Sequence, residues 1–368
     1  MTAAFSGALE ALRDLLSGVP GLGWVTYAPY AFRPFVLVVV LALVVGPVST
    51  IVNLRRLEFN AEAMVHSVFP GIVAAAVWWG TRMIIPGAAL AAVAATCALV
   101  AASRSKRENE AATAVVLATF FSIGVIISLR KGDMSGQLEA LMFGRLMEMS
   151  DERLMQSLIV CALALAALAL TWKEQVFVAH DRDGARVAGV RVLAVDVVIN
   201  AAIGAVVVAA SAAIGVLLVI GYVVVPGVGA RLAAPSATRM SATASGIALV
   251  GALSGLALMN APTARPVSPQ AALALTVIAV SAVVGGWGLL RERMRGPVGE
   301  PAAAPAGPQG DEGTAVEGAA LANPGGGERA AVEGAAALAP TDGEWSTDLA
   351  AASQSASASC RAPLGSPS

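Results

Sequence analysis

The sequence predicts an all-α polytopic membrane protein with about nine transmembrane helices. Of its 368 residues, 57% are hydrophobic and only 13% are charged, which is far more apolar than an average soluble domain. Apolar runs of about 20 residues also recur along the chain, and this is the length that a helix needs to cross ~30 Å of hydrocarbon. The three cysteines are far apart and form no CxxC pair, so they indicate neither a disulfide framework nor a thiolate metal site.

The predicted spans follow one another from residue 35 to residue 290. They fall at about 35–53, 62–80, 84–102, 110–129, 154–172, 194–212, 214–232, 241–259 and 270–290. The apolar stretch from Ala194 to Leu232 is about twice one span, so we divide it near Ala213 and expect a very tight turn there. Between the spans, the two longest loops are 130–153, which contains LEALMFGRLMEM and is expected to hold a short helix, and 173–193.

Both ends of the chain differ from this membrane domain, which we place at 35–296. Residues 1–34 combine a weakly amphipathic stretch, ALEALRDLL, with Tyr27 and Tyr30, a pattern typical of an interfacial segment with an aromatic anchor. Residues 297–368 are rich in Gly, Ala, Pro, Ser and Glu and contain nine acidic and two basic residues. Such a segment cannot bury enough apolar surface to offset its ordering entropy, so we expect a disordered acidic tail.

The distribution of Lys and Arg between the loops predicts the orientation. With the N-terminus outside and the C-terminus in the cytoplasm, 14 basic residues before the tail lie on the cytoplasmic side and eight on the outer side. The positive-inside rule favours this arrangement, which places the 173–193 loop and the acidic tail in the cytoplasm.

The second run opens with a carboxylate and an imidazole, in the stretch NAEAMVHSVFPG. Glu62 precedes His66 by four residues, so both side chains project from one face of a helix, and together they suit a divalent metal such as Zn²⁺ or Mn²⁺. An ionisable residue at membrane depth is a candidate functional site. The structural alternative is that Glu62 is solvated at the helix start and His66 forms a hydrogen bond with a neighbouring helix.

The later runs add three candidates for a transport pathway. Pro226, in IGVLLVIGYVVVPGVGARL, removes a helical hydrogen bond and frees the carbonyl of Tyr222, which predicts a kink near the cytoplasmic end. Asn200 could line the same pathway. The alternatives are a kink used only for packing and an Asn that bonds a neighbouring helix.

The loop 173–193 contains HDRDGARVAGVR, in which Asp181 is placed to cap a short polar helix that Gly189 ends. An ordinary solvated connector is the alternative. The chain has no GxxxxGK[ST] phosphate loop, so it has no ATPase site of the usual kind, and its Glu and His occur as ExxxH rather than HExxH, which argues against a zinc protease. We therefore expect a protein that is not an enzyme.

Five of these stretches, in this order, resemble the integral-membrane permeases of ABC transporters that import manganese, zinc or iron. Arg55, Arg56 and AEAMVHSVFPG resemble an Arg-Arg followed by GDALSHSxLPG, and NEAATAVV resembles the start of the family's fourth helix. The MFG of the outer loop, HDRDGARVAGV and IGVLLVIGYVVVPGVGARL are similar to the family's LFG, its cytoplasmic loop and its seventh helix. The chain departs from the pattern at Glu62 for Asp, at Val65 for Ser, and in PGVGAR for PAATAR.

The resemblance implies a type II ABC importer-like permease in the cell membrane, surrounded by lipid and active as a homodimer. It implies two cytoplasmic ABC ATPase subunits, an extracytoplasmic substrate-binding protein and no nucleic-acid partner. The transported ion would be the only metal, with no permanent cofactor, and Glu62 and His66 would be its ligands. By resemblance, the helix that docks on the ATPase includes Asp181, Asp183, Ala185 and Gly189. The alternatives are an ABC permease for another substrate, such as a metal chelate, and a secondary transporter coupled to an ion gradient.

Overall fold

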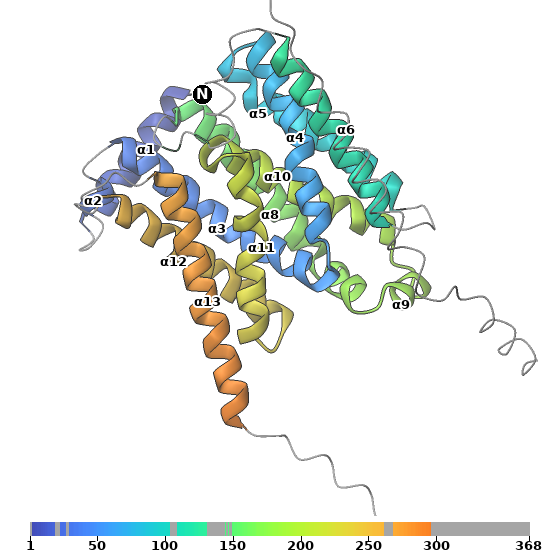
Figure 1. Ribbon diagram of the computed structural model, residues 1–368. Coiled ribbons are helices and arrows are strands. Elements are labelled where there is room, and N and C mark those ends of the chain that lie inside the picture. Colours follow the sequence, from blue (N-terminus) through green and yellow to red (C-terminus); the bar gives the residue numbers. More distant parts are fainter. Residues whose placement is uncertain are drawn as a thin grey trace, which may run out of the picture. The chain divides into compact units, whose positions relative to one another are not determined.

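The structure, a computed structural model, describes residues 2–18, 23–26, 29–103, 109–130, 144, 146, 149–260 and 268–295. The elements in these ranges are all helical (Figure 1). In the first half of the chain they are α1 (Thr2–Ser17), α2 (Gly23–Thr26), α3 (Pro29–Arg55), α4 (Glu58–Trp78), the 3-10 turn η1 (Thr81–Met83), α5 (Ile84–Ala102) and α6 (Asn109–Leu129). The second half contains α8 (Asp151–His180), α9 (Arg182–Val187), α10 (Val192–Ile214), α11 (Val216–Ala233), α12 (Ala237–Asn260) and α13 (Pro269–Arg295).

Within the described ranges, eight helices are long and apolar enough to cross a membrane: α3, α4, α5, α6, α8, α10, α12 and α13. The remaining long helix, α11, has 18 residues and is also apolar. These helices match the predicted apolar runs one for one, so the prediction of an all-helical protein with about nine spans is confirmed.

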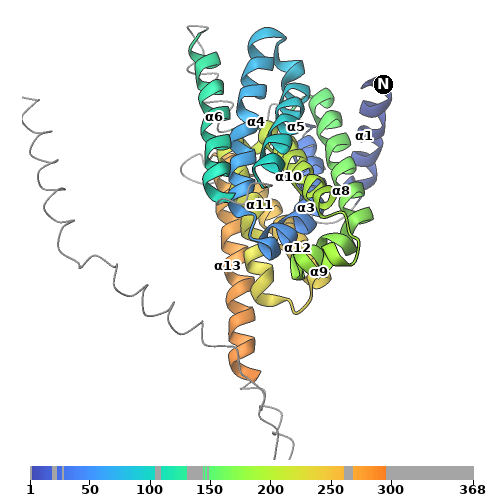
Figure 2. The same cartoon turned by 90° about the vertical axis from the view of Figure 1, so that its right-hand side faces the viewer.

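Within residues 29–295, α10 contacts most of the other long helices. These neighbours are α8, α5, α4, α3 and α11. α4, α5 and α6 lie side by side, while α12 packs against α13, α11 and α3 (Figures 1 and 2). Glycines allow the closest approaches: a Cβ added at Gly71 of α4 would lie 2.3 Å from the carbonyl oxygen of Gly87 in α5.

The turn between α10 and α11 is a single residue. Gly215 joins Ile214 to Val216 with φ +88°, a conformation that glycine adopts without steric cost. The predicted division near Ala213 is therefore right to within two residues. Gly144, from the MFG motif between α6 and α8, packs against this turn, because a Cβ on it would lie 2.4 Å from the Gly215 nitrogen.

α8 is longer than its apolar run. The prediction of a loop beginning at residue 173 is wrong, since the helix continues to His180. Gln175 and Val178 are three residues apart on one face, both are buried, and the Gln175 Nε2 donates a hydrogen bond to the Val195 carbonyl of α10 at 3.0 Å. At ~1.5 Å per residue, a helix of 30 residues is about 45 Å long, so α8 extends beyond a ~30 Å hydrocarbon layer.

Three predictions concern residues outside the described ranges. They are most of the short helix expected in 138–149, the Tyr27 anchor together with the Tyr30 side chain, and the acidic tail 297–368. The amphipathic stretch before Tyr27 is described and forms α1. Its Leu9 and Leu16 pack toward the core, and its Leu15 is exposed.

Candidate functional site

Glu62 and His66 lie in the first half of α4, which begins after a tight turn at Arg56 with φ +54°. Glu62 is exposed and His66 is half-buried. The imidazole ring meets the Phe121 ring of α6 edge to face, with centroids 5.3 Å apart and an interplanar angle of 81°. In the part of the chain that the structure describes, His66 makes no hydrogen bond to a neighbouring helix, which is the bond that the structural alternative requires.

One copy of this pair is an incomplete metal site. A carboxylate and an imidazole at i and i+4 are about 5–6 Å apart at Cβ and can bind one ion together. Protein sites for Zn²⁺ usually supply three or four ligands. The described ranges contain no group of three or more His, Cys, Asp or Glu side chains that could hold a metal ion. Glu62 and His66 can therefore offer one oxygen and one nitrogen, and a closed site needs further ligands from elsewhere.

The pathway candidates Asn200 and Tyr222 are buried in other parts of the bundle. The Asn200 Nδ2 donates to the Asp196 carbonyl one turn earlier in α10, at 2.9 Å, and its Oδ1 has no hydrogen-bond partner among the described residues. The Tyr222 hydroxyl of α11 lies 3.4 Å from the Ala248 carbonyl of α12. No hydrogen bond within the described ranges joins either residue to Glu62 or His66.

Pro226 lies inside α11, and α3 provides partners for the backbone groups around it. Because proline has no N–H, the Tyr222 carbonyl loses its helical donor. The next N–H, that of Gly227, donates to Ser49 Oγ at 2.7 Å, and Asn53 Nδ2 donates to the Val224 carbonyl at 3.2 Å. The two helices are therefore joined by side-chain to backbone hydrogen bonds at the proline.

The connection between α8 and α10 contains the short helix that its sequence predicts. Asp181 caps α9, since its Oδ1 accepts hydrogen bonds from the Asp183 and Gly184 nitrogens at 3.1 and 2.9 Å. Gly189 follows the helix with φ +85°, and the Val190 nitrogen donates back to the Ala185 carbonyl at 3.0 Å, as in a Schellman-type ending. Both capping predictions are confirmed.

The side chain of Ala185 faces the protein. It is fully buried in a small apolar cluster with Val178 of α8 and Val192 and Val195 of α10. The outward side of α9 consists instead of Asp183, Arg186 and Val187, and Val187 is 90% exposed. Among the four residues assigned to docking, Ala185 thus holds α9 on the bundle, and Asp181, Asp183 and Gly189 are exposed.

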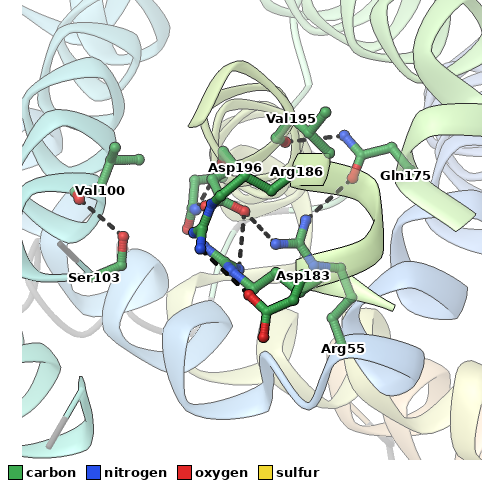
Figure 3. A network of polar contacts seen from close by, with 10 residues as sticks. Arg55, Val100, Ser103, Gln175, Asp183, Arg186, Val195 and Asp196 are labelled. Carbon is green, nitrogen blue, oxygen red and sulfur yellow. Dashed lines mark hydrogen bonds and ion pairs between the residues drawn. The ribbon is translucent and has the colours of Figure 1, made fainter. Parts of the chain in front are cut away.

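The sequence analysis missed a buried polar cluster next to α9. Arg55 of α3 forms an ion pair with Asp196 of α10, and its Nη1 also donates to the Gln175 Oε1 of α8 at 3.3 Å (Figure 3). Arg182 of α9 pairs with the same carboxylate at 2.6 Å. Arg55 and Asp196 are 141 positions apart, so spacing along the chain cannot reveal the contact. The available signal was a lone Asp in the otherwise uncharged run that begins at Ala194.

Comparison with known proteins agrees with this architecture. The profile of the ABC 3 transport family matches residues 28–286. The manganese transport system membrane protein MntC of Listeria monocytogenes is 26% identical over 219 residues, which cover 59% of this chain and 77% of that protein. The zinc transport system membrane protein TroC of Treponema pallidum is 27% identical over 252 residues, which cover 66% and 84%.

A solved structure shows the same fold. The chain resembles PsaBC from Streptococcus pneumoniae, determined in complex with a Fab, with a TM-score of 0.62 and 19% identity over 77% of this chain and 95% of that one. The family match covers the long helices from α3 to α12 in full and α13 as far as residue 286. The chain therefore belongs to the ABC 3 transport family, as a multi-pass membrane permease subunit of an ABC transporter.

Proposed function

We propose that this permease imports a divalent metal ion, manganese, zinc or iron, and that Glu62 and His66 bind the ion during transit. The pair on α4 carries the proposal, since it places an anionic oxygen and an imidazole on one face of an apolar helix. At ~1.5 Å per residue, His66 lies about 12 Å along α4 from its first residue, well inside a ~30 Å hydrocarbon layer. Relatives whose names refer to manganese and zinc transport support a metal as the cargo.

The incomplete ligand set is compatible with transport. Two ligands hold a metal weakly, and a transit site must release its ion as well as bind it. If two copies of the chain bring their α4 helices together, two oxygens and two nitrogens form a transient site of the kind that Zn²⁺ or Mn²⁺ accepts. The exposed carboxylate of Glu62 would be energetically costly if it faced lipid inside a membrane span. The face of α4 that carries it is better suited to contact a second copy of the chain or to line a water-filled pathway.

In this proposal the permease works as a homodimer in the cell membrane, with its N-terminus outside and its C-terminus in the cytoplasm. Two separate ABC ATPase subunits bind at α9 on the cytoplasmic side and hydrolyse ATP, and an extracytoplasmic binding protein delivers the ion. ATP binding and hydrolysis shift the permease between states that open to opposite sides. Lipid covers the exposed apolar side chains of α5, α6, α8 and α13.

The test removes each ligand separately and keeps much of the size of the side chain. Glu62→Gln removes the negative charge and His66→Gln removes the imidazole, while both retain hydrogen-bonding capacity. We expect normal membrane abundance and ATPase association, with metal uptake reduced at least tenfold, which corresponds to ~1.4 kcal/mol of lost barrier lowering. Uptake into cells is measured with Mn²⁺, Zn²⁺ and Fe²⁺ in turn.

Glu58→Gln is the matched control, because it removes a carboxylate from the first turn of the same helix. It is expected to leave uptake within about twofold of the wild-type rate. Wild-type uptake of all three metals by a Glu62→Gln/His66→Gln double variant would disprove the metal site. A chelate or another cargo would then be the better candidate for this permease.

A further inference from the structure

One buried carboxylate, that of Asp196 in α10, is shared by two arginines from different helices. Arg55, the last residue of α3, pairs with its Oδ1 (Figure 3). Arg182, the first residue of α9, lies 2.6 Å from its Oδ2 through Nη2. The side chains of Arg55 and Asp196 are only 6% and 7% exposed, whereas that of Arg182 is 46% exposed. The carboxylate therefore joins a fully enclosed arginine to one at the surface.

Further hydrogen bonds hold the enclosed half of this cluster in place. Arg55 also donates to Gln175 of α8, and the Gln175 Nε2 in turn donates to the Val195 carbonyl, next to Asp196. Separating two desolvated charges leaves each without compensation, which is strongly unfavourable. The end of α3 and the start of α10 must therefore move as one unit.

The same end of α3 is also bonded to α11. Ser49 Oγ accepts from the Gly227 nitrogen at 2.7 Å, Asn53 Nδ2 donates to the Val224 carbonyl at 3.2 Å, and Arg231 Nη1 donates to the Asn53 carbonyl at 3.1 Å. These bonds span Pro226, where α11 lacks a hydrogen bond of its own. The last two turns of α3 thus lie between the carboxylate cluster and the proline of α11.

We propose that Asp196 is a positioning residue that passes displacement of α9 to α11 through Arg182, Arg55 and the end of α3. The inference rests on the proposed function, in which α9 is the element that the ATPase moves. Ala185 holds α9 through small apolar contacts, which permit sliding, whereas the paired charges fix its first residue to α10. The ion pair between Arg182 and Asp196 therefore converts movement of α9 into movement of the membrane-spanning helices.

Arg182→Gln tests the link without leaving a charge buried alone, because Asp196 keeps Arg55. Full-length permease, reconstituted in proteoliposomes with its ATPase and binding protein, is assayed for Mn²⁺ uptake and ATP hydrolysis in the same sample. We expect the ATPase to remain bound and hydrolysis to continue, with at least fivefold less Mn²⁺ moved per ATP. Arg182→Lys, which keeps the charge, should recover part of the loss.

Arg191→Gln is the control. Arg191 is exposed between α9 and α10 and forms no ion pair with any residue in the described ranges. Arg191→Gln removes one positive charge from the connection between α8 and α10, as Arg182→Gln does, but it breaks no described ion pair. The ratio of Mn²⁺ uptake to ATP hydrolysis should therefore stay within about twofold of the wild-type value.

A distance measurement separates a mechanical role from a purely structural one. Spin labels are placed on Val187→Cys in α9 and Val228→Cys in α11, in a background without the native cysteines. When the Arg182–Asp196 ion pair is intact, α9 and α11 move together, so ATP binding leaves the distance between the labels unchanged. In Arg182→Gln, α9 moves without α11, so ATP binding changes that distance.

The outcomes distinguish the inference from the function on which it rests. Wild-type uptake per ATP in Arg182→Gln, with an unchanged label distance, would overturn the coupling role and leave the proposed function intact. A wild-type permease that binds no ATPase would overturn both, because no displacement of α9 would then exist. Loss of coupling in Arg182→Gln but not in Arg191→Gln, with a nucleotide-dependent label distance, supports the inference.

Discussion

Gly227 shows how single residues set the contact between α3 and α11. A Cβ at this position would lie 2.3 Å from Asn53 Nδ2 and 2.5 Å from Ser49 Oγ, the two side chains that bond the α11 backbone beside Pro226. Glycine is required here for close approach rather than for an unusual backbone angle. The polar bonds around the proline exist only because this residue has no side chain.

Gly227→Ala should therefore destabilise the permease by about 1–3 kcal/mol, the usual cost of overpacking a close contact. Gly221 is the matched control on the same helix, since a Cβ there has no atom within 4 Å. We expect a lower thermal unfolding temperature in detergent for Gly227→Ala and little change for Gly221→Ala. Equal unfolding temperatures would show that α3 and α11 can separate at no cost.

At the scale of elements, α9 depends on its neighbours for its position. It has six residues, far fewer than a helix needs to be stable alone in water, so its caps and its contact with α8 and α10 must hold it. Ala185 is the apolar part of that contact and Ala188, at the C-cap, is exposed. A charged side chain at position 185 would have to be buried unpaired or would displace the helix.

Ala185→Glu should release α9 from the bundle, and Ala188→Glu should leave it in place. Hydrogen–deuterium exchange of residues 182–188 measures this directly, because local opening sets the exchange rate. We expect exchange at least tenfold faster in Ala185→Glu, equivalent to ~1.4 kcal/mol of lost local stability. Equal protection of the two variants would mean that the apolar contact does not hold α9.

The contrast between α8 and α9 shows what the sequence could and could not reveal. The ends of α9 were predictable because Asp181 and Gly189 act on backbone groups within four residues of themselves. The end of α8 was not, since polarity from Lys173 onward suggested a loop, whereas Gln175 is buried by a bond to α10. Likewise the spacing of Glu62 and His66 was enough to propose them as a pair on one helical face, whereas the Asp196 cluster depends on contacts between distant helices.

For the molecule as a whole, the orientation in the membrane is a prediction from the 14 and eight basic residues on its two sides. It can be tested with single cysteines in a background without Cys97, Cys161 and Cys360. Val187 in α9 and Leu15 in α1 are suitable positions, because 90% and 75% of these residues are exposed, whereas Ala185 is buried.

An impermeant maleimide added to intact cells should label Leu15→Cys and leave Val187→Cys unmodified. Permeabilised cells should label both, which controls for reactivity. Labelling of Val187→Cys in intact cells would reverse the topology and with it the assignment of α9 to the cytoplasmic side.

The glycine contact at the α10–α11 turn also constrains the order in which the chain is made. Gly144 packs against Gly215, and its carbonyl accepts a hydrogen bond from Gln270 Nε2 in α13 at 2.9 Å. Both partners are synthesised well after Gly144 has left the ribosome. Gly144 therefore has no complete binding site until α10, α11 and the start of α13 have been inserted. This contact forms only near the end of biogenesis, after translation of the last span has begun, and it closes the bundle.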